Sequence, residues 1–161
     1  MTPVRRLTVA SLLAALITLS TLFLKVPGIT GYYHLGDGFV FLAALILPAG
    51  VAAAAAAIGS ALADVLSGSY VAWAPWTFVI KGLAALVVGL IGTGRSLARD
   101  LPAMFVGAFM IVAGYAVATW ILYGWAAVPA ETYFNLGQTG TGIVVAAVLV
   151  AALRRSKALR R

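Results

Sequence analysis

Apolar runs separated by short polar segments fill most of this chain. The runs cover about residues 7–24, 38–47, 50–66, 75–91, 102–125 and 131–153. Most of them approach the ~20 residues that an α-helix needs to cross the apolar part of a bilayer. The pattern predicts an all-α integral membrane protein that forms a single membrane domain over residues 1–161, with six transmembrane helices in a compact bundle.

The second and third runs belong to one uncharged stretch, residues 38–63, which is too long for one upright helix. Pro48 and Gly50 lie inside it. Because proline lacks a backbone donor and glycine loosens a helix, we expect the break there. The second helix is then short, so it should be tilted, partly shielded by its neighbours or extended past the proline. Connections are expected at residues 67–74, 92–101 and 126–130, so the fifth helix should start after Pro102.

Composition supports the membrane assignment. Hydrophobic residues make up 63% of the chain and charged residues 9%, whereas a soluble domain carries about 25% charged residues. So few charges cannot cover a surface that faces water. The first run, which follows Arg5 and Arg6, could also be a signal peptide. It is longer than a signal core and no small-x-small cleavage site follows it, so we interpret it as a transmembrane span.

The basic residues predict the orientation. With the N-terminus in the cytoplasm, six spans place nine basic residues on the cytoplasmic side and only Lys25 on the outer side. This bias is the positive-inside pattern of a multi-pass cell-membrane protein with both termini inside. It also explains the net charge of +7 without nucleic acid as a partner. The nine residues are Arg5, Arg6, Arg95, Arg99, Arg154, Arg155, Lys157, Arg160 and Arg161.

Enzymatic chemistry finds little support in the sequence. There is no cysteine, and the single histidine lies in an outer loop without a serine motif nearby. There is no HExxH zinc helix and no phosphate-binding P-loop, so this chain cannot hydrolyse ATP itself. We expect a protein that is not an enzyme and that has no metal site and no cofactor.

Most acidic groups and the histidine lie at the outer ends of the predicted spans: His34, Asp37, Asp64 and Glu131. Lys81 lies about six residues into the fourth span, hence ~9 Å below its outer end. A lysine at that depth is costly against lipid, so it needs a partner or a wet cavity. Asp37 and Asp64 are the expected counter-ions, either in a solute pocket or in an ion pair that only holds helices together. Asp100, in contrast, is expected in a solvated cytoplasmic charge cluster.

Aromatic and amide groups gather on the same outer side, and part of them should form the usual interfacial belt. Flat rings with a few hydrogen-bonding groups also suit a planar heteroaromatic solute. Asn135 and Gln138 are three positions apart and share a helix face with each other and with Glu131. The candidate binding residues are Tyr33, His34, Asp37, Asp64, Tyr70, Trp73, Lys81, Glu131, Asn135 and Gln138.

Small residues mark a further surface. Ala10 and Ala14 lie four apart in the first span, and the third span is almost entirely small over residues 52–63. Such faces let helices approach closely. The contact could be within this bundle or with a separate membrane partner.

The order of motifs resembles the substrate-binding S components of energy-coupling factor (ECF) vitamin transporters, in the riboflavin-type branch. The motifs are Tyr33-His34-Leu35-Gly36-Asp37, Leu47-Pro48-Ala49-Gly50, Gly59-Ser60-Ala61-Leu62-Ala63-Asp64, Ala74-Pro75, Lys81-Gly82 and Asn135-Leu136-Gly137-Gln138. The resemblance implies six helices that hold a vitamin near the outer face, under the loop between the first two helices. It also implies a prokaryotic cell-membrane location. Ala10 and Ala14 match a motif that docks on the transmembrane coupling subunit, which works with two cytoplasmic ATPase subunits.

In the mechanism that the resemblance implies, the vitamin binds from outside, the loop at Tyr32 to Asp37 closes as a lid, and the S component topples when ATP drives its partners. The substrate stays open among riboflavin, a pyridoxine-like vitamer and a hydroxymethylpyrimidine-like compound. A stand-alone carrier or channel without ATPase partners is the alternative function. A structural or sensory membrane protein would bind no vitamin.

Overall fold

The computed structural model describes residues 2–28, 31–92, 94 and 96–156. Their helices are α1 (Pro3–Phe23), α2 (Gly36–Ile46), α3 (Ala49–Leu66), α4 (Ala74–Ile91), α5 (Leu97–Tyr123) and α6 (Val128–Arg155). All except α2 are long and apolar enough to cross a membrane. The predicted all-α membrane bundle is confirmed. The residues Ile29, Thr30, Arg95, Lys157, Arg160 and Arg161 lie outside the described part.

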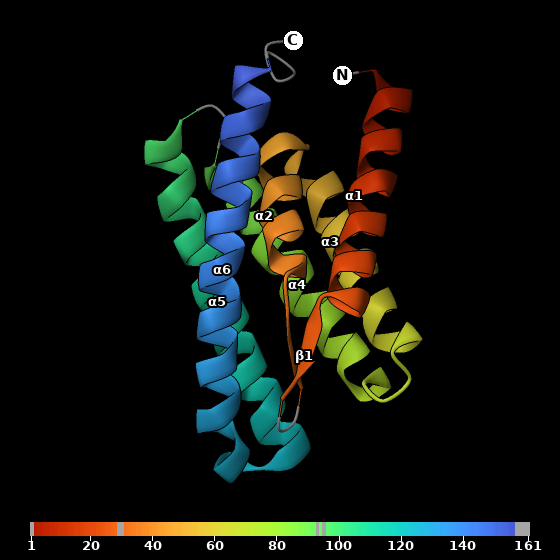
Figure 1. Cartoon of the computed structure of the whole chain (residues 1–161), viewed down its shortest axis with the longest axis vertical. Helices are drawn as coiled ribbons and strands as arrows, with labels where there is room; N and C mark the ends of the chain where they lie inside the picture. The colour runs from red at the N-terminus through yellow and green to blue at the C-terminus, as the bar shows by residue number, and fades with distance from the viewer. Residues whose placement is uncertain (1, 29–30, 93, 95, 157–161) are drawn as a thin grey trace.

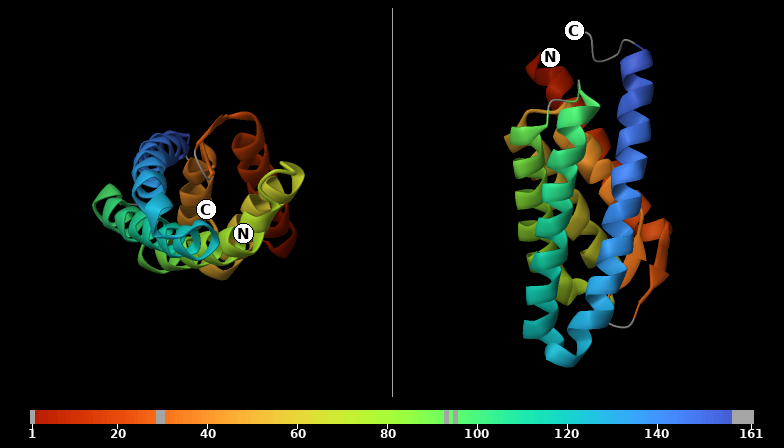
Figure 2. Two further views of the ribbon diagram at one scale, coloured as in Figure 1. Left: turned by 90° about the horizontal axis from the view of Figure 1, so that it is seen from below. Right: turned by 90° about the vertical axis from the view of Figure 1, so that its left-hand side faces the viewer.

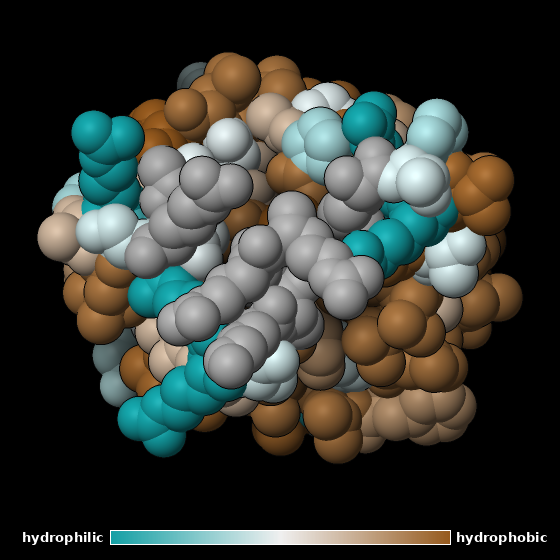
Figure 3. All heavy atoms as spheres, turned by 90° about the horizontal axis from the view of Figure 1, so that it is seen from above, coloured by the Kyte–Doolittle hydropathy of each residue, from teal (hydrophilic) through white to brown (hydrophobic). Residues whose placement is uncertain are grey.

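Both termini lie at one end of the bundle (Figure 1). Viewed from that end, hydrophilic side chains are set among apolar ones (Figure 3). An even number of crossings returns the chain to the side on which it began. This arrangement agrees with the orientation predicted from the charge bias, in which both termini face the cytoplasm.

The short helix α2 lies inside a ring formed by the longer helices (Figure 2). It spans 11 residues, and Val40, Phe41 and Ala43 on three of its sides are fully buried. Pro48, which follows its C-cap, prevents its continuation. Because protein surrounds α2, it does not have to match the thickness of the bilayer. Its first turn, with Asp37, therefore lies in the interior of the protein.

The fifth helix begins earlier than expected. The segment at residues 97–101 was expected to be part of a polar connection, but it forms the first turn of α5, and Pro102 lies inside the helix. Pro102 lacks the N–H that would bond to the carbonyl four residues earlier, so α5 loses one hydrogen bond close to its start. Asp100 in that first turn also interacts favourably with the helix dipole.

The outer connections are more regular than expected. Residues Val71–Trp73 and Trp125–Ala127 form 3-10 turns that lead directly into α4 and α6. The segment between α1 and α2, expected to be a loop, is an antiparallel hairpin in which β1 (Lys25–Pro27) pairs with β2 (Tyr32–His34). The hairpin lies against α1 and α6 in the half of the bundle away from the termini (Figures 1 and 2). Asp37 belongs to α2, so the expected lid at Tyr32 to Asp37 is not one flexible loop.

Candidate ligand-binding site

A small polar cavity lies beneath the hairpin. Its volume of about 30 Å³ is room for roughly two water molecules. The hairpin and the helices α1, α3, α4, α5 and α6 all contribute to its wall. The lining residues are Thr21, Gly31, Tyr32, His34, Ser60, Asp64, Trp73, Thr77, Tyr115, Glu131, Asn135 and Gln138.

Tyr32 connects the hairpin to α3. Its hydroxyl donates a hydrogen bond to Asp64 Oδ1 at 2.5 Å. Its ring lies 4.4 Å from the ring of Tyr70, and Lys25 Nζ lies 5.1 Å from the Tyr32 ring centre. Burial and the neighbouring Asp64 raise the pKa of the Tyr32 hydroxyl above its usual value. The hydroxyl therefore keeps its proton and acts as a donor to the carboxyl group.

His34 is a neutral member of the lining. Its Nδ1 accepts a hydrogen bond from the Gly36 N–H at 3.0 Å and lies 3.4 Å from Thr21 Oγ1. Because a backbone N–H can only donate, the ring proton belongs on Nε2. Burial lowers the pKa of His34 from 6.5 to about 4, so the ring carries no charge near neutral pH.

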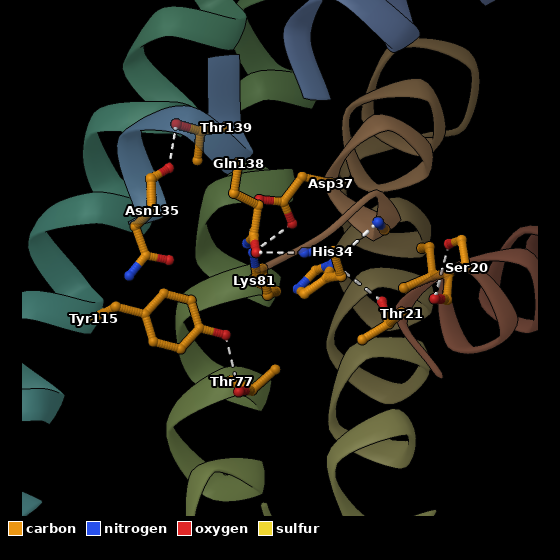
Figure 4. Close-up of polar contacts among 12 residues, drawn as sticks. Ser20, Thr21, His34, Asp37, Thr77, Lys81, Tyr115, Asn135, Gln138 and Thr139 are labelled. Carbon is orange, nitrogen blue, oxygen red and sulfur yellow. Dashed lines mark hydrogen bonds and ion pairs between the residues drawn. The ribbon is translucent and has the colours of Figure 1, made fainter. Parts of the chain in front are cut away.

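A buried ion pair lies next to the side chains that line the cavity (Figure 4). Lys81 Nζ on α4 pairs with Asp37 Oδ1 on α2, and both side chains are fully buried. The other oxygen of Asp37 accepts from Gln138 Nε2 at 3.0 Å, and Gln138 Oε1 accepts from the His34 N–H at 3.1 Å. The pair thus orients Gln138 and the hairpin.

Lys81 and Asp37 were expected in the pocket, but neither lines the cavity. A lysine inside an apolar bundle needs a counter-ion, and Lys81 and Asp37 neutralise each other's charge. Neither charge is then available to a ligand. Lys81 also lies 5.2 Å from the Tyr115 ring centre. We therefore interpret the Lys81–Asp37 pair as a structural contact that holds the lining residues in place.

Three polar side chains of α6 reach the cavity from one helix face. Glu131, Asn135 and Gln138 are all buried, and all three line the cavity. Asn135 Nδ2 donates to Glu131 Oε1 at 3.3 Å and to the Glu131 carbonyl at 2.9 Å. The helix face that these three residues were expected to share is the face of α6 that lines the cavity.

Asp64 does not pair with Lys81, contrary to expectation. Its Oδ1 accepts from Tyr32, and its Oδ2 is buried without a hydrogen-bond partner among the described residues. Ser60, one turn earlier on α3, has a buried hydroxyl in the same situation. Asp37 is therefore the one counter-ion that reaches Lys81 in the described structure.

Comparison with known proteins assigns the chain to a family. Residues 1–155 match the family described as the S component of the ECF-type riboflavin transporter. The chain is an ECF S component. It is also 33% identical to a Pyrococcus woesei protein described as an "uncharacterized protein in gap 3'region", over 132 residues that cover 80% of this chain and 88% of that protein. As a member, it is a membrane-embedded, multi-pass, substrate-binding subunit of a transport system and is not itself an enzyme.

Two aromatic residues that were expected in the pocket of this S component lie outside its lining. The Tyr33 hydroxyl lies 2.5 Å from Thr141 Oγ1 on α6. Neighbouring residues of a strand point to opposite sides, so Tyr33 faces away from the side shared by Tyr32 and His34. Tyr70 packs against Tyr32 from outside. Trp73 does line the cavity, with its ring centre 5.7 Å from that of Tyr115.

Sequence reasoning missed five lining side chains: Thr21, Tyr32, Ser60, Thr77 and Tyr115. Ser60 and Thr77 each lie one helical turn before a singled-out residue, Asp64 and Lys81, so the four-residue spacing could have found them. Tyr32 was expected as the start of the lid and was not among the candidate binding residues. Tyr115, whose hydroxyl lies 2.9 Å from Thr77 Oγ1, is in the middle of an apolar run, where Thr119, four positions later, is the only nearby polar side chain.

The S component also has an apolar groove of about 700 Å³ between α1 and α3. Ala10 and Ala14 line it, as do the exposed Ala15 and Ala54. The small residues also bring the two helices together, because a Cβ on Gly59 would lie 2.6 Å from the Ala14 carbonyl oxygen. The small residues of the groove therefore do both: Ala14 and Gly59 pack the two helices together, and Ala15 and Ala54 are exposed on the surface.

Proposed function

We propose that this S component captures a water-soluble, vitamin-like heteroaromatic compound from the outer side of a prokaryotic cell membrane. It would pass this substrate to an ECF transmembrane coupling subunit driven by two cytoplasmic ATPase subunits. The observation that carries the proposal is a polar and aromatic cavity inside an apolar bundle, at the end opposite the termini, in a chain of this family. Its lining combines flat rings with amide, hydroxyl and carboxyl groups, which suit a planar heterocycle with polar edges.

Binding would require the site to open. Ligand sites typically measure about 300–1,000 Å³, while this cavity measures about 30 Å³. The hairpin contributes Gly31, Tyr32 and His34 to the wall. Its outward movement would break the Tyr32–Asp64 hydrogen bond and uncover the cavity. We therefore propose the hairpin, in place of a simple loop, as the cover of the site.

The groove between α1 and α3 is the proposed docking surface for the coupling subunit. Ala10 and Ala14 form part of its floor, and the exposed Leu7, Leu19 and Ile58 add apolar side chains to it. A small-residue floor permits close approach of a partner helix.

The most direct test of capture is to purify the protein, extract it with organic solvent and identify any copurified vitamin by mass spectrometry. We expect one heteroaromatic compound near one equivalent per chain. Asn135→Ala should lose it, because this change removes an amide from the lining, while Tyr133→Ala, at an exposed α6 position, should retain it. A protein that carries no vitamin and is stabilised by none would contradict the proposal.

The docking surface can be tested with Ala15→Trp and Ala54→Trp. Both positions are exposed in the groove, so the variants should fold and bind substrate normally while ATP-dependent uptake by the assembled transporter falls at least tenfold. Val117→Trp, at a half-exposed position on α5, is the matched control and should transport normally. Uptake that needs neither coupling subunits nor ATP would instead favour a stand-alone carrier.

A further inference from the structure

The cavity has unused hydrogen-bonding capacity on one wall. Among the described residues, the buried side-chain atoms without a partner are Arg6 Nε, Ser60 Oγ and Asp64 Oδ2. The last two belong to residues that line the cavity, one turn apart on α3. Asp64 as a whole is only 3% exposed. A buried acceptor in this state costs free energy that a ligand donor would recover.

The charges around the cavity are unbalanced. Asp64 and Glu131 both line it, and among the described residues its lining includes no lysine or arginine. Lys81 is paired with Asp37. Lys25 donates to Ser67 Oγ at 2.9 Å and lies beside the rings of Tyr32 and Tyr70, outside the lining. His34 is neutral because burial lowers its pKa to about 4.

The remaining wall suits a flat cation. Tyr32, Trp73 and Tyr115 present aromatic rings to the cavity, and the face of such a ring attracts a positive charge. A buried carboxylate is stabilised strongly by a cation that also donates a hydrogen bond to it. A ligand that is both aromatic and cationic would satisfy the rings and the carboxyl group together.

We propose that this site selects a small nitrogen heterocycle that carries a positive charge, on a protonated amine or a ring nitrogen, with an N–H donated to Asp64 Oδ2. This inference rests on the proposed function and narrows its substrate class. Ser60 Oγ meets a second polar edge of the ligand, and Glu131 adds to the negative potential. An uncharged three-ring flavin leaves the Asp64 carboxyl group without a cation, and an anion is repelled by it.

The test is calorimetric titration of the purified full chain at pH 7.5 with four probes. Thiamine and pyridoxamine are cationic, riboflavin is neutral and pantothenate is anionic. We expect a cationic probe to bind at least 100-fold more tightly than riboflavin, and pantothenate not to bind. Asp64→Asn should weaken the cationic probe at least tenfold, since the amide still accepts from Tyr32 but loses the charge. Asp100→Asn, which removes a carboxyl group at the other end of the bundle, should leave its affinity unchanged.

Two results would overturn the inference and leave the proposed function standing. One is riboflavin binding more tightly than either cation. The other is an Asp64→Asn variant with unchanged affinity for the cation. If none of the probes binds and no vitamin copurifies, the proposed function itself fails. A copurified vitamin without positive charge would support capture and contradict the cationic substrate class.

Discussion

The two ends of the bundle bury carboxyl groups in opposite ways. At the end with the termini, Asp100 on α5 is 1% exposed and accepts a hydrogen bond from the Gly94 N–H at 3.1 Å. It also pairs with Arg154 on α6, whose Nε donates to the Gly94 carbonyl at 2.9 Å. Beneath the hairpin, Asp64 is equally buried, but one of its oxygens has no partner among the described residues.

We interpret the fully paired carboxyl groups as structural and the partly unpaired one as a candidate ligand-binding group. Asp100 and Asp37 each have a cation and a further donor, and each connects segments that are far apart in sequence. A buried carboxyl group with complete pairing stabilises the fold. Asp64 connects the hairpin to α3, lines the cavity, and has one oxygen without a hydrogen-bond partner among the described residues. Asp100 was expected in a solvated cluster, and that expectation is wrong because α6 covers it.

The largest effect should come from breaking the support of the outer site. Lys81→Met leaves Asp37 buried without its cation, which should lower the free energy of unfolding by about 3–5 kcal/mol. Thermal unfolding in detergent, followed by intrinsic fluorescence, measures this loss.

The double variant Lys81→Met with Asp37→Asn is the control, because it removes both charges and keeps an acceptor for Gln138. It should recover more than half of the loss. If Lys81→Met alone were as stable as the wild type, the Lys81–Asp37 pair would not have the structural role proposed for it.

The comparison between the two ends can be made directly with Asp100→Asn and Asp64→Asn. Asp100→Asn should cost about 1–3 kcal/mol, because charged hydrogen bonds to Gly94 and Arg154 are weakened. The side chain of Arg154 is 25% exposed, so water limits the penalty at that partner. Asp64→Asn should change the stability of the ligand-free protein by less than about 1 kcal/mol, since its carboxyl group has no cation to lose. Equal losses in the two variants would contradict the comparison.

The smallest effect should be a pH dependence confined to the outer end. The pKa of His34 is lowered from 6.5 to about 4, so the unfolded chain binds more protons between these values. The contribution of His34 is complete above pH 6.5 and is lost as the pH falls toward 4, by about 1 kcal/mol at pH 5.5. His34→Gln should show a smaller drop in stability between pH 7 and pH 5.5. If both proteins lose stability equally, the titrating group is elsewhere.

Much of the site could be placed in advance at the level of helices and sides. His34, Asp64, Glu131, Asn135 and Gln138 do meet at one cavity, as expected from topology and from the spacing along α6. The partners of the charges could not be predicted. The predicted topology places Asp37, Asp64 and Lys81 on the same side of the membrane, and the packing of α2 decides that Asp37 is the one that reaches Lys81.

By itself the sequence determined that the chain forms six apolar helices, with its basic residues at one end and its polar aromatic segments at the other. These are properties of single segments, because helix length, charge bias and the four-residue repeat are all local. The tertiary structure decided which buried groups are paired. The contacts Lys81–Asp37, Tyr32–Asp64 and Arg154–Asp100 join positions 44, 32 and 54 residues apart. Such contacts depend on how helices pack, and packing leaves Asp64 in the cavity lining with one oxygen that has no hydrogen-bond partner among the described residues.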